Sequence, residues 1–150
     1  MSKTIIVSNR LPVKISNLDN SFKFSSTSGG LATGMSSIHK SKKFLWIGWP
    51  GIEKKSLDKD QLNKAKKLLF EKNYIPVFLN KKEINDFYYG LSNKALWPLF
   101  HYFIEYSVFN RSHWESYVSV NQKFANKVIQ NSEKDDIVWI HDYQLLLCPK

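Results

Sequence analysis

The 150-residue chain has a single cysteine, Cys148, which leaves it without an internal disulfide or a zinc site built on cysteines. Such a composition fits the reducing cytosol. No apolar run approaches the roughly 18 residues of a membrane-spanning helix, which argues against a membrane protein. The first four residues lead straight into a strand-like run, which disfavours a secretory signal. We therefore expect a cytoplasmic protein.

Arginine is also scarce, with only Arg10 and Arg111, although the net charge is +9. Arginine is the commonest reader of base edges in nucleic acids. The charge excess is local: residues 40–82 carry 12 lysines and 4 acidic residues, and the other 107 residues carry 10 basic and 9 acidic groups. We interpret this excess as a solvated, lysine-rich helix face. A basic nucleic-acid-binding module is the weaker alternative, resting on the lysines alone.

Several catalytic and cofactor motifs are missing. The chain has no P-loop and no G-x-G-x-x-G fingerprint. It has no G-x-S-x-G elbow, and Cys148 lies in an apolar run, so nucleophilic catalysis has no support. The histidines show neither metal-ligand spacing nor an H-E-x-x-H pattern, so we expect no metal site; they are His39, His101, His113 and His141.

What is present is the material of one well-packed domain, with 43% hydrophobic and 15% aromatic residues. Continuous apolar runs predict strands over 4–8, 44–48, 74–79 and 137–140, with a further short strand over 13–15. Pro76 predicts an edge or irregular position for the third of these runs. The last run is β-branched and predicts a core strand, whereas the polar stretch 17–28 predicts a loop.

Helical periodicity falls between the strands. It predicts helices over 31–40, 58–72, 81–89, 93–103 and 112–130. We expect Gly90 to separate the third and fourth helices, Asn93 to cap the fourth, and Ser112 with Glu115 to form a capping box at the last. Strands that alternate with helices predict an α/β fold, with a Rossmann-like parallel sheet and helices on both faces.

Candidate binding residues follow the predicted strands, because ligands of open α/β sheets bind beyond the carboxyl ends of the strands. Arg10, Trp49 and Asp142 follow three of them, and Gly29-Gly30 and Tyr88 lie in connecting segments. Arg10 could clasp a phosphate or carboxylate. Asp142 could accept hydrogen bonds from sugar hydroxyls. The glycine pair could bring backbone N–H groups close to an anion.

Each of these residues also has a purely structural interpretation. Arg10 could form a surface ion pair, the glycine pair could be a turn before a helix, and Asp142 could cap a helix over 143–147. Trp49, Tyr88 and Trp97 could stack on a sugar ring, but aromatic residues at helical spacing are more often core. The core interpretation is strongest for Trp97, which stands among apolar neighbours.

The same stretches resemble the trehalose-6-phosphate synthase family. Six motifs occur in the family's order and together span the chain: 6–12 (IVSNRLP), 28–34 (SGGLATG), 46–51 (WIGWPG), 87–93 (FYYGLSN), 96–102 (LWPLFHY) and 138–143 (VWIHDY). Two motifs depart from the usual pattern. Residues 87–91 (FYYGL) stand where the family has Tyr-Tyr-Asn-Gly-Phe, so we align Tyr88 with the ligand-binding tyrosine, and Gln144 replaces a histidine.

The resemblance implies a retaining, metal-independent glycosyltransferase with two Rossmann-like domains. It would transfer glucose from UDP-glucose, a co-substrate, to glucose 6-phosphate, and no separate cofactor is implied. Carried over by motif, Arg10 would hold the 6-phosphate, Trp49, Tyr88 and Trp97 would shape the acceptor pocket, and Asp142 would bind acceptor hydroxyls. Gly29 and Gly30 would approach the donor diphosphate. No catalytic residue is assigned.

Three donor-side features of the family have no counterpart in this chain: a later histidine, the basic pair that clasps the donor phosphates and the acidic residues that bind the donor sugar. We therefore expect residues 1–150 to form the acceptor-side Rossmann-like domain, itself incomplete, of a two-domain glycosyltransferase. The parent could be a homo-oligomer or part of a synthase/phosphatase complex. We expect no turnover from the 150 residues alone, because half a cleft cannot orient two substrates. The alternative is a truncated or regulatory synthase-like subunit without turnover of its own.

Overall fold

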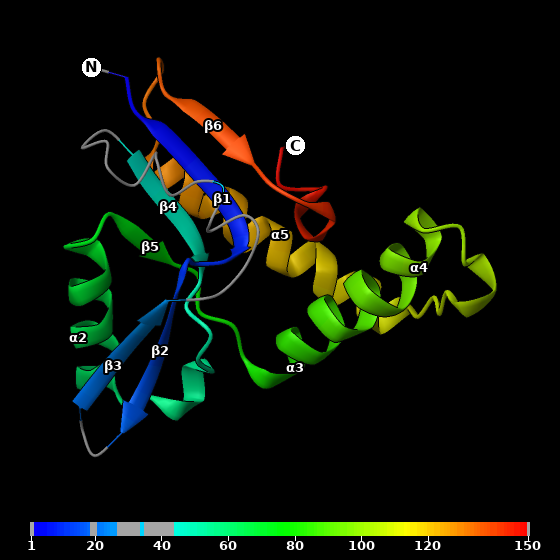
Figure 1. Cartoon of the computed structure of the whole chain (residues 1–150), viewed down its shortest axis with the longest axis horizontal. Helices are drawn as coiled ribbons and strands as arrows, with labels where there is room; N and C mark the ends of the chain where they lie inside the picture. The colour runs from blue at the N-terminus through cyan, green and yellow to red at the C-terminus, as the bar shows by residue number, and fades with distance from the viewer. Residues whose placement is uncertain (1, 19–20, 27–33, 35–43, 150) are drawn as a thin grey trace.

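The structure is a computed structural model that describes residues 2–18, 21–26, 34 and 44–149. Four parallel strands form its central sheet in the order β5-β4-β1-β6. Their bounds are Thr4–Arg10 for β1, Phe44–Trp49 for β4, Tyr74–Pro76 for β5 and Ile137–Ile140 for β6. Helices lie on both sides of the sheet (Figure 1). The predicted α/β fold is therefore confirmed.

The helices account for most of the remaining chain. They are α2 (Lys59–Phe70), α3 (Lys81–Glu83), the π-helix η3 (Ile84–Leu96), α4 (Trp97–Phe100) and α5 (Arg111–Asn131). The described residues also form 3-10 turns at η2 (Lys54–Ser56), η4 (Ile104–Tyr106) and η5 (Tyr143–Leu145). The predicted helix over 31–40 lies outside the described residues except for Gly34.

The two central strands separate two hydrophobic cores. Ile5 and Val7 of β1 pack with Ile47 of β4 into a core that α5 and η3 cover. Ile6 and Trp46 point to the other face, into a core that α2 covers. Strands that are buried on both faces are apolar throughout, which is why β1 and β4 stand out in the sequence as continuous apolar runs.

A two-stranded antiparallel hairpin joins the second core. Its strands are β2 (Val13–Leu18) and β3 (Ser21–Ser26). The predicted strand over 13–15 is therefore longer than expected. The predicted loop over 17–28 is wrong for 17–18 and 21–26, and its other residues lie outside the described ones. Phe22 and Phe24 alternate with polar residues, the period of a half-buried strand, and both pack against the core under α2.

One continuous helical segment runs through α3, η3 and α4, so Gly90 does not break it and Asn93 caps no helix. Its middle is wound as a π-helix: the N–H of Trp97 bonds to the carbonyl of Ser92, five residues earlier. A Cβ on Gly90 would stand 2.7 Å from the His113 ring of α5, so glycine permits this close approach. Gly90 therefore marks a close contact between helices here and not the end of a helix.

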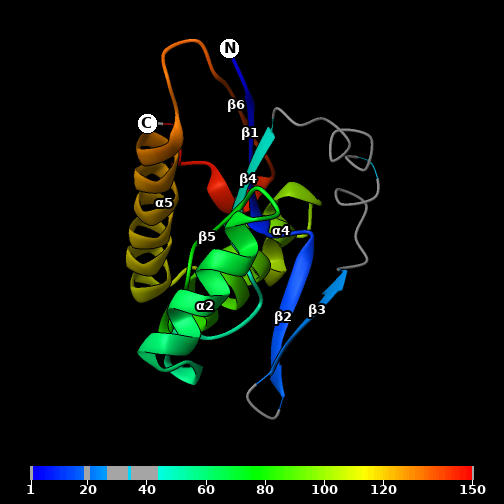
Figure 2. The ribbon, with the colours of Figure 1, turned by 90° about the vertical axis from the view of Figure 1, so that its left-hand side faces the viewer.

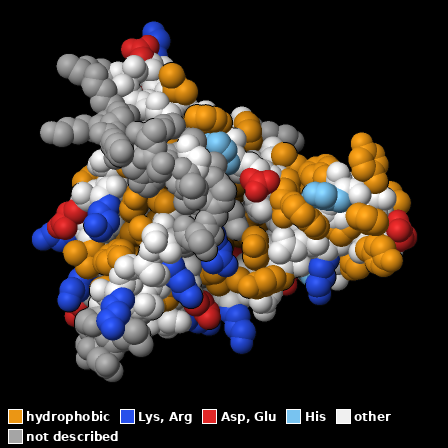
Figure 3. Space-filling view, viewed as in Figure 1, with side chains coloured by type: hydrophobic (Ala, Val, Ile, Leu, Met, Phe, Trp, Pro, Cys, Tyr) orange, Lys and Arg blue, Asp and Glu red, His pale blue; other side chains and the backbone are white. Residues whose placement is uncertain are grey.

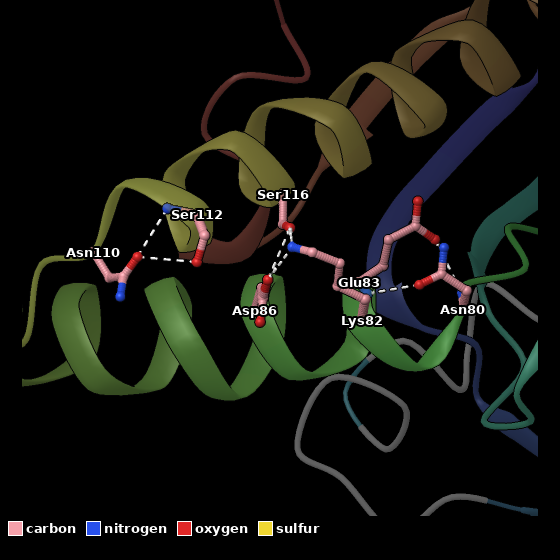
Figure 4. Close-up of polar contacts among 7 residues, drawn as sticks. All are labelled: Asn80, Lys82, Glu83, Asp86, Asn110, Ser112 and Ser116. Atoms are coloured by element: carbon pink, nitrogen blue, oxygen red, sulfur yellow. Dashed lines mark hydrogen bonds and ion pairs between the residues drawn. The ribbon is translucent and has the colours of Figure 1, made fainter.

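Polar contacts tie this segment to α5 (Figure 4). Lys82 and Asp86 form an ion pair, and the Ser116 hydroxyl of α5 lies 3.4 Å from an oxygen of Asp86. Figure 4 also shows the start of α5, where Asn110 accepts hydrogen bonds from the backbone N–H and the hydroxyl of Ser112. The predicted Ser112–Glu115 capping box is therefore wrong, since the N-cap is Asn110.

The two edges of the sheet differ from each other. As Pro76 predicts, β5 is an edge strand, and it ends at that residue. At the other edge, β6 exposes Ile137 and Trp139, so the prediction of a core strand there is wrong. No helix among the described residues is long and apolar enough to cross a bilayer.

Candidate functional site

Three of the predicted site residues meet at the carboxyl edge of the sheet. The guanidinium carbon of Arg10 lies 4.7 Å from the ring centroid of Trp49 and 5.7 Å from that of Tyr88. These residues come from the end of β1, the end of β4 and the π-helix η3. Cation–π attraction holds an arginine at such distances. The exposed guanidinium is therefore fixed in place by two rings.

An irregularity in β1 brings Arg10 to this position. Val7 pairs with Ile47, but Arg10 pairs with Trp49, so β1 holds one residue more than β4 over this stretch. A bulge of this kind reverses the alternation of side chains and redirects those beyond it. Gly48 allows the two strands to approach, because a Cβ there would lie 2.7 Å from the backbone nitrogen of Leu11.

The surface ion-pair interpretation of Arg10 receives no support. Among the described residues, no carboxylate oxygen lies within 4.0 Å of its guanidinium nitrogens. The chain's other arginine, Arg111, does have such a partner, since its Nε lies 2.9 Å from Glu115. Arg10 therefore presents hydrogen-bond donors that its described neighbours leave available for an anion.

Trp49 is buried, and its contacts limit what it can do. Its indole N–H donates to the carbonyl of Ile52 at 3.0 Å, and only 6% of the residue is exposed. A ring this deeply buried offers little surface to a ligand. Its geometry suits the support of Arg10 better than stacking on a sugar.

Trp97 is half-exposed, contrary to the core interpretation of that residue. Its ring lies 3.8 Å from that of His101 and 5.6 Å from that of Tyr143. An exposed indole face beside other rings can stack on the apolar face of a sugar. The structure places Trp97 near the carboxyl end of β6, without a ring contact to Arg10 among the described interactions.

Asp142 follows β6 in an unusual backbone conformation. Its φ of 75° and ψ of 163° lie in a region that residues other than glycine rarely adopt, and such strain concentrates at functional sites. Its Oδ1 accepts a hydrogen bond from the N–H of Tyr143 at 2.8 Å, so it does cap the 3-10 turn η5. The side chain is nevertheless exposed, and its second oxygen has no partner among the described residues. Capping and ligand binding are thus compatible.

Tyr143, which the sequence analysis did not single out, connects the two halves of the site. Its hydroxyl donates to Oδ1 of Asn93 at 3.2 Å, and its carbonyl accepts from the hydroxyl of Tyr117. Burial, followed by the nearby Asp142 and Tyr88, raises the pKa of Tyr143. The side chain therefore stays neutral between Tyr88 and Asp142. Only its place beside Asp142 in the motif could have indicated it.

Three polar side chains around these strand ends carry buried atoms without a partner. They are Oδ1 of Asn9, Nε2 of His141 and Oε1 of Gln144, judged against the described residues. Burial lowers the pKa of His141, although Asp142 opposes the shift, so the imidazole is neutral at pH 7. Buried polar atoms are nearly always hydrogen-bonded in folded proteins, so unpaired ones beside a candidate site are consistent with a ligand or water.

Three further predictions concern the glycine pair, a metal site and Cys148. Gly29 and Gly30 lie outside the described residues. Within the described part of the chain, no group of three or more histidine, cysteine, aspartate or glutamate side chains is placed to hold a metal ion. Cys148 is buried, which raises its pKa to about 11, so its thiol is unreactive at neutral pH.

Comparison with known proteins identifies the family. The model of glycosyltransferase family 20 matches residues 2–150. The chain belongs to glycosyltransferase family 20. A curated relative from Candida albicans, the UDP-forming alpha,alpha-trehalose-phosphate synthase, is 40% identical over 149 residues. That match covers 99% of this chain and 31% of the relative, so this family 20 chain spans about a third of the length of the curated relatives it matches.

Solved structures of the family have the same fold. The trehalose-6-phosphate synthase from E. coli bound with UDP-2-fluoro glucose gives a TM-score of 0.70 at 30% identity, over 98% of this chain and 29% of that one. The Burkholderia xenovorans enzyme in complex with glucose-6-phosphate gives 0.70 at 26% identity, with the same coverage. This family 20 chain therefore resembles the part of those synthases that its 150 residues span.

Proposed function

We propose that this chain is the acceptor-side part of a UDP-forming alpha,alpha-trehalose-phosphate synthase. Such an enzyme transfers glucose from UDP-glucose to glucose 6-phosphate. The observation that carries the proposal is the guanidinium of Arg10, fixed by Trp49 and Tyr88 and without a carboxylate partner among the described residues. Family membership supports it, as do similar structures bound with glucose-6-phosphate and with a UDP-glucose analogue.

Different residues of the site bind different parts of the acceptor. A planar guanidinium can donate two parallel hydrogen bonds to a phosphate, so Arg10 fixes the 6-phosphate end of the sugar. The free oxygen of Asp142 accepts a hydrogen bond from a ring hydroxyl, and the exposed face of Trp97 packs on the sugar ring. Held at three points, the acceptor presents its anomeric hydroxyl in one orientation, which is a large part of catalysis for a transfer between two bound substrates.

The donor lies on the other side of this acceptor in the proposal. The bond from the glucose C1 to the diphosphate oxygen breaks, a bond from C1 to the acceptor hydroxyl oxygen forms, and the hydroxyl proton is released. Negative charge develops on UDP as it leaves, and the backbone N–H groups of Gly29 and Gly30 are the proposed donors that stabilise it. We place no metal and no cofactor in this scheme, and we assign the protein to the cytoplasm.

The test measures acceptor binding through tryptophan fluorescence, because Trp49 and Trp97 belong to the site. Arg10→Ala should weaken glucose 6-phosphate binding roughly ten- to a hundredfold, the range for loss of charge-assisted hydrogen bonds. Arg10→Lys should restore part of the affinity, since a lysine keeps the charge without the planar fork.

Arg111→Ala is the matched control, because it removes the same side chain from a site paired with Glu115. It should leave glucose 6-phosphate binding unchanged. Equal affinities for Arg10→Ala and the unmodified chain would refute the assignment of the phosphate to this residue.

A further inference from the structure

A large groove opens at the β5 edge of the sheet, between α2 and α5. Its volume is about 980 Å³, and its lining comes from both helices and from β5 with the residues that follow it. Figure 2 shows β5 between the two helices in this view. The site around Arg10 has no residue in the groove, which therefore lies outside the machinery of the proposed function.

The floor of the groove is apolar. Ile75 and Val77 form its base, and Leu62 and Phe78 add half-buried side chains. Phe70, at the end of α2, also lines the groove and is 64% exposed. Ile75 and Val77 are themselves buried, so the apolar surface that remains open to solvent comes from Phe70 and from the half-buried Leu62 and Phe78. Apolar side chains gathered along a groove favour contact with another molecule.

The rim of the groove is basic. Among the described residues, no aspartate or glutamate lines it, whereas five lysines do: Lys54, Lys66, Lys67, Lys123 and Lys127. Lys123 pairs with Glu83, and the Lys127 ammonium donates to Gln130. The other three have no carboxylate within 4.0 Å in the described part of the chain. The groove therefore combines apolar contact with uncompensated positive charge.

The edge strand favours one form of occupant over another. An extended peptide could bind by adding a strand to β5, which pairs only with β4 within the described sheet. Pro76 has no N–H to offer such a strand, and β5 is only three residues long. A helix makes its own backbone hydrogen bonds and needs only side-chain contacts, so it suits this edge better.

We propose that the groove binds an acidic amphipathic helix of a partner protein. Its apolar face would pack on Phe70, Leu62 and Phe78, and its flanking carboxylates would meet the lysine rim. A second copy of this chain is a poorer occupant, because its net charge of +9 repels an identical surface. Nucleic acid is also a poorer occupant, because the groove has an apolar floor and no arginine at its rim.

The test uses a synthetic peptide of about fifteen residues, with leucines on one helical face and glutamates elsewhere, read by fluorescence anisotropy. The 150-residue chain should bind it, and affinity should fall as salt rises. A scrambled peptide of the same composition has no apolar face and should bind at least about tenfold more weakly.

Substitutions in α2 distinguish peptide binding in the groove from nonspecific attraction to a basic protein. Lys66→Glu with Lys67→Glu should weaken binding at least about tenfold, and so should Phe70→Ser. Lys59→Glu with Lys64→Glu changes the net charge equally on exposed positions of the same helix outside the groove, and it should have a much smaller effect. Unchanged circular dichroism establishes that each variant is folded.

Three results would overturn the proposal. The first is equal binding of the ordered and scrambled peptides, and the second is an equal loss in the two double-lysine variants. The third is a double-stranded oligonucleotide that binds more tightly than the peptide and loses affinity in the groove variants. None of these measurements involves glucose 6-phosphate, so the outcome is independent of the proposed function.

Discussion

Asp136 links the residue before β1 to the turn before β6 through contacts with Lys3 and Glu133. Its carboxylate forms an ion pair with the Lys3 ammonium at 2.6 Å and accepts hydrogen bonds from the backbone N–H groups of Lys3 and Glu133. The hydrogen bond from the Lys3 side chain is the largest cause that lowers the pKa of Asp136 to about 2. These contacts all favour the ionised carboxylate.

We expect this carboxylate to give stability a dependence on acid pH. A folded-state pKa below the ordinary value of 3.8 means that the stabilisation is fully present above about pH 4. It is lost as pH falls through 2. Urea unfolding should therefore show Asp136→Asn to be less stable than the unmodified chain at pH 7, with the difference shrinking between pH 4 and pH 2.

The neighbouring exposed carboxylate provides the control for this experiment. Asp135→Asn removes the same charge from a position without a described partner, and it should change stability little at either pH. A stability difference for Asp136→Asn that stays constant down to pH 2 would contradict the interpretation.

Among the structural elements, the π-helical segment depends on the absence of a side chain at Gly90. A Cβ at this position would meet three atoms of the His113 ring at 2.7–2.9 Å. Overpacking of this kind costs about 1–3 kcal/mol, which exceeds the roughly 1 kcal/mol that alanine gains over glycine in a helix. We expect Gly90→Ala to lower the free energy of unfolding.

A double-mutant cycle isolates this contact. In a His113→Ala background the obstruction is gone, so Gly90→Ala should cost less there than in the unmodified chain. Chemical denaturation of the four proteins gives the coupling energy directly. Identical costs in the two backgrounds would mean that the ring of His113 is not the obstacle.

Sequence patterns predict most of the helices and strands, but not where one element ends and the next begins. The four runs that form sheet strands are long and apolar enough to be recognised, and α5 follows a clear helical period. Gly90 is misleading in the sequence, because a glycine usually marks the end of a helix. Here it lies inside a helical segment, where the facing ring of His113 leaves no room for a Cβ. Asn110 and Ser112 are both good N-cap residues, and local pattern alone does not rank them.

Sequence patterns likewise predict only some features of the candidate site. The carboxyl-end rule places Arg10, Trp49 and Asp142 on the correct edge of the sheet before any coordinates are known. The bulge that turns Arg10 onto Trp49 has no signature in the sequence, since it depends on pairing with a strand about 40 residues away. Tyr143 was missed for a related reason, because its partners come from η3 and α5.

For the molecule as a whole, the net charge and the exposed apolar surface have opposite effects on self-association. The segment 97–109, here called the aromatic lobe, exposes large side chains at one end of the molecule (Figure 3); they include Trp97, Phe100, Tyr102, Phe103, Tyr106 and Phe109. An apolar surface of this kind favours association. The net charge of +9 opposes it through repulsion that salt screens.

We therefore expect self-association of the 150-residue chain to rise with ionic strength. Sedimentation velocity at about 0.01 M and about 1 M salt spans a change in screening length from roughly 30 Å to roughly 3 Å. Tyr102→Ser with Phe103→Ser should reduce the association at high salt, whereas Ile129→Ser on α5 should not. Association that is equal at both salt concentrations, or greater at low salt, would count against this balance.

The position of β1 in the sheet also bears on how the chain folds as it is made. β1 pairs with β4 on one side and with β6 on the other, and β6 starts 88 residues after β4 ends. At about 5–20 residues per second, a ribosome needs roughly 4–18 s to cover that interval. Throughout it, the backbone N–H and C=O groups along one edge of β1 are unpaired and open to wrong partners. The nascent chain is thus most vulnerable to aggregation, and most in need of a chaperone, between the synthesis of these two strands.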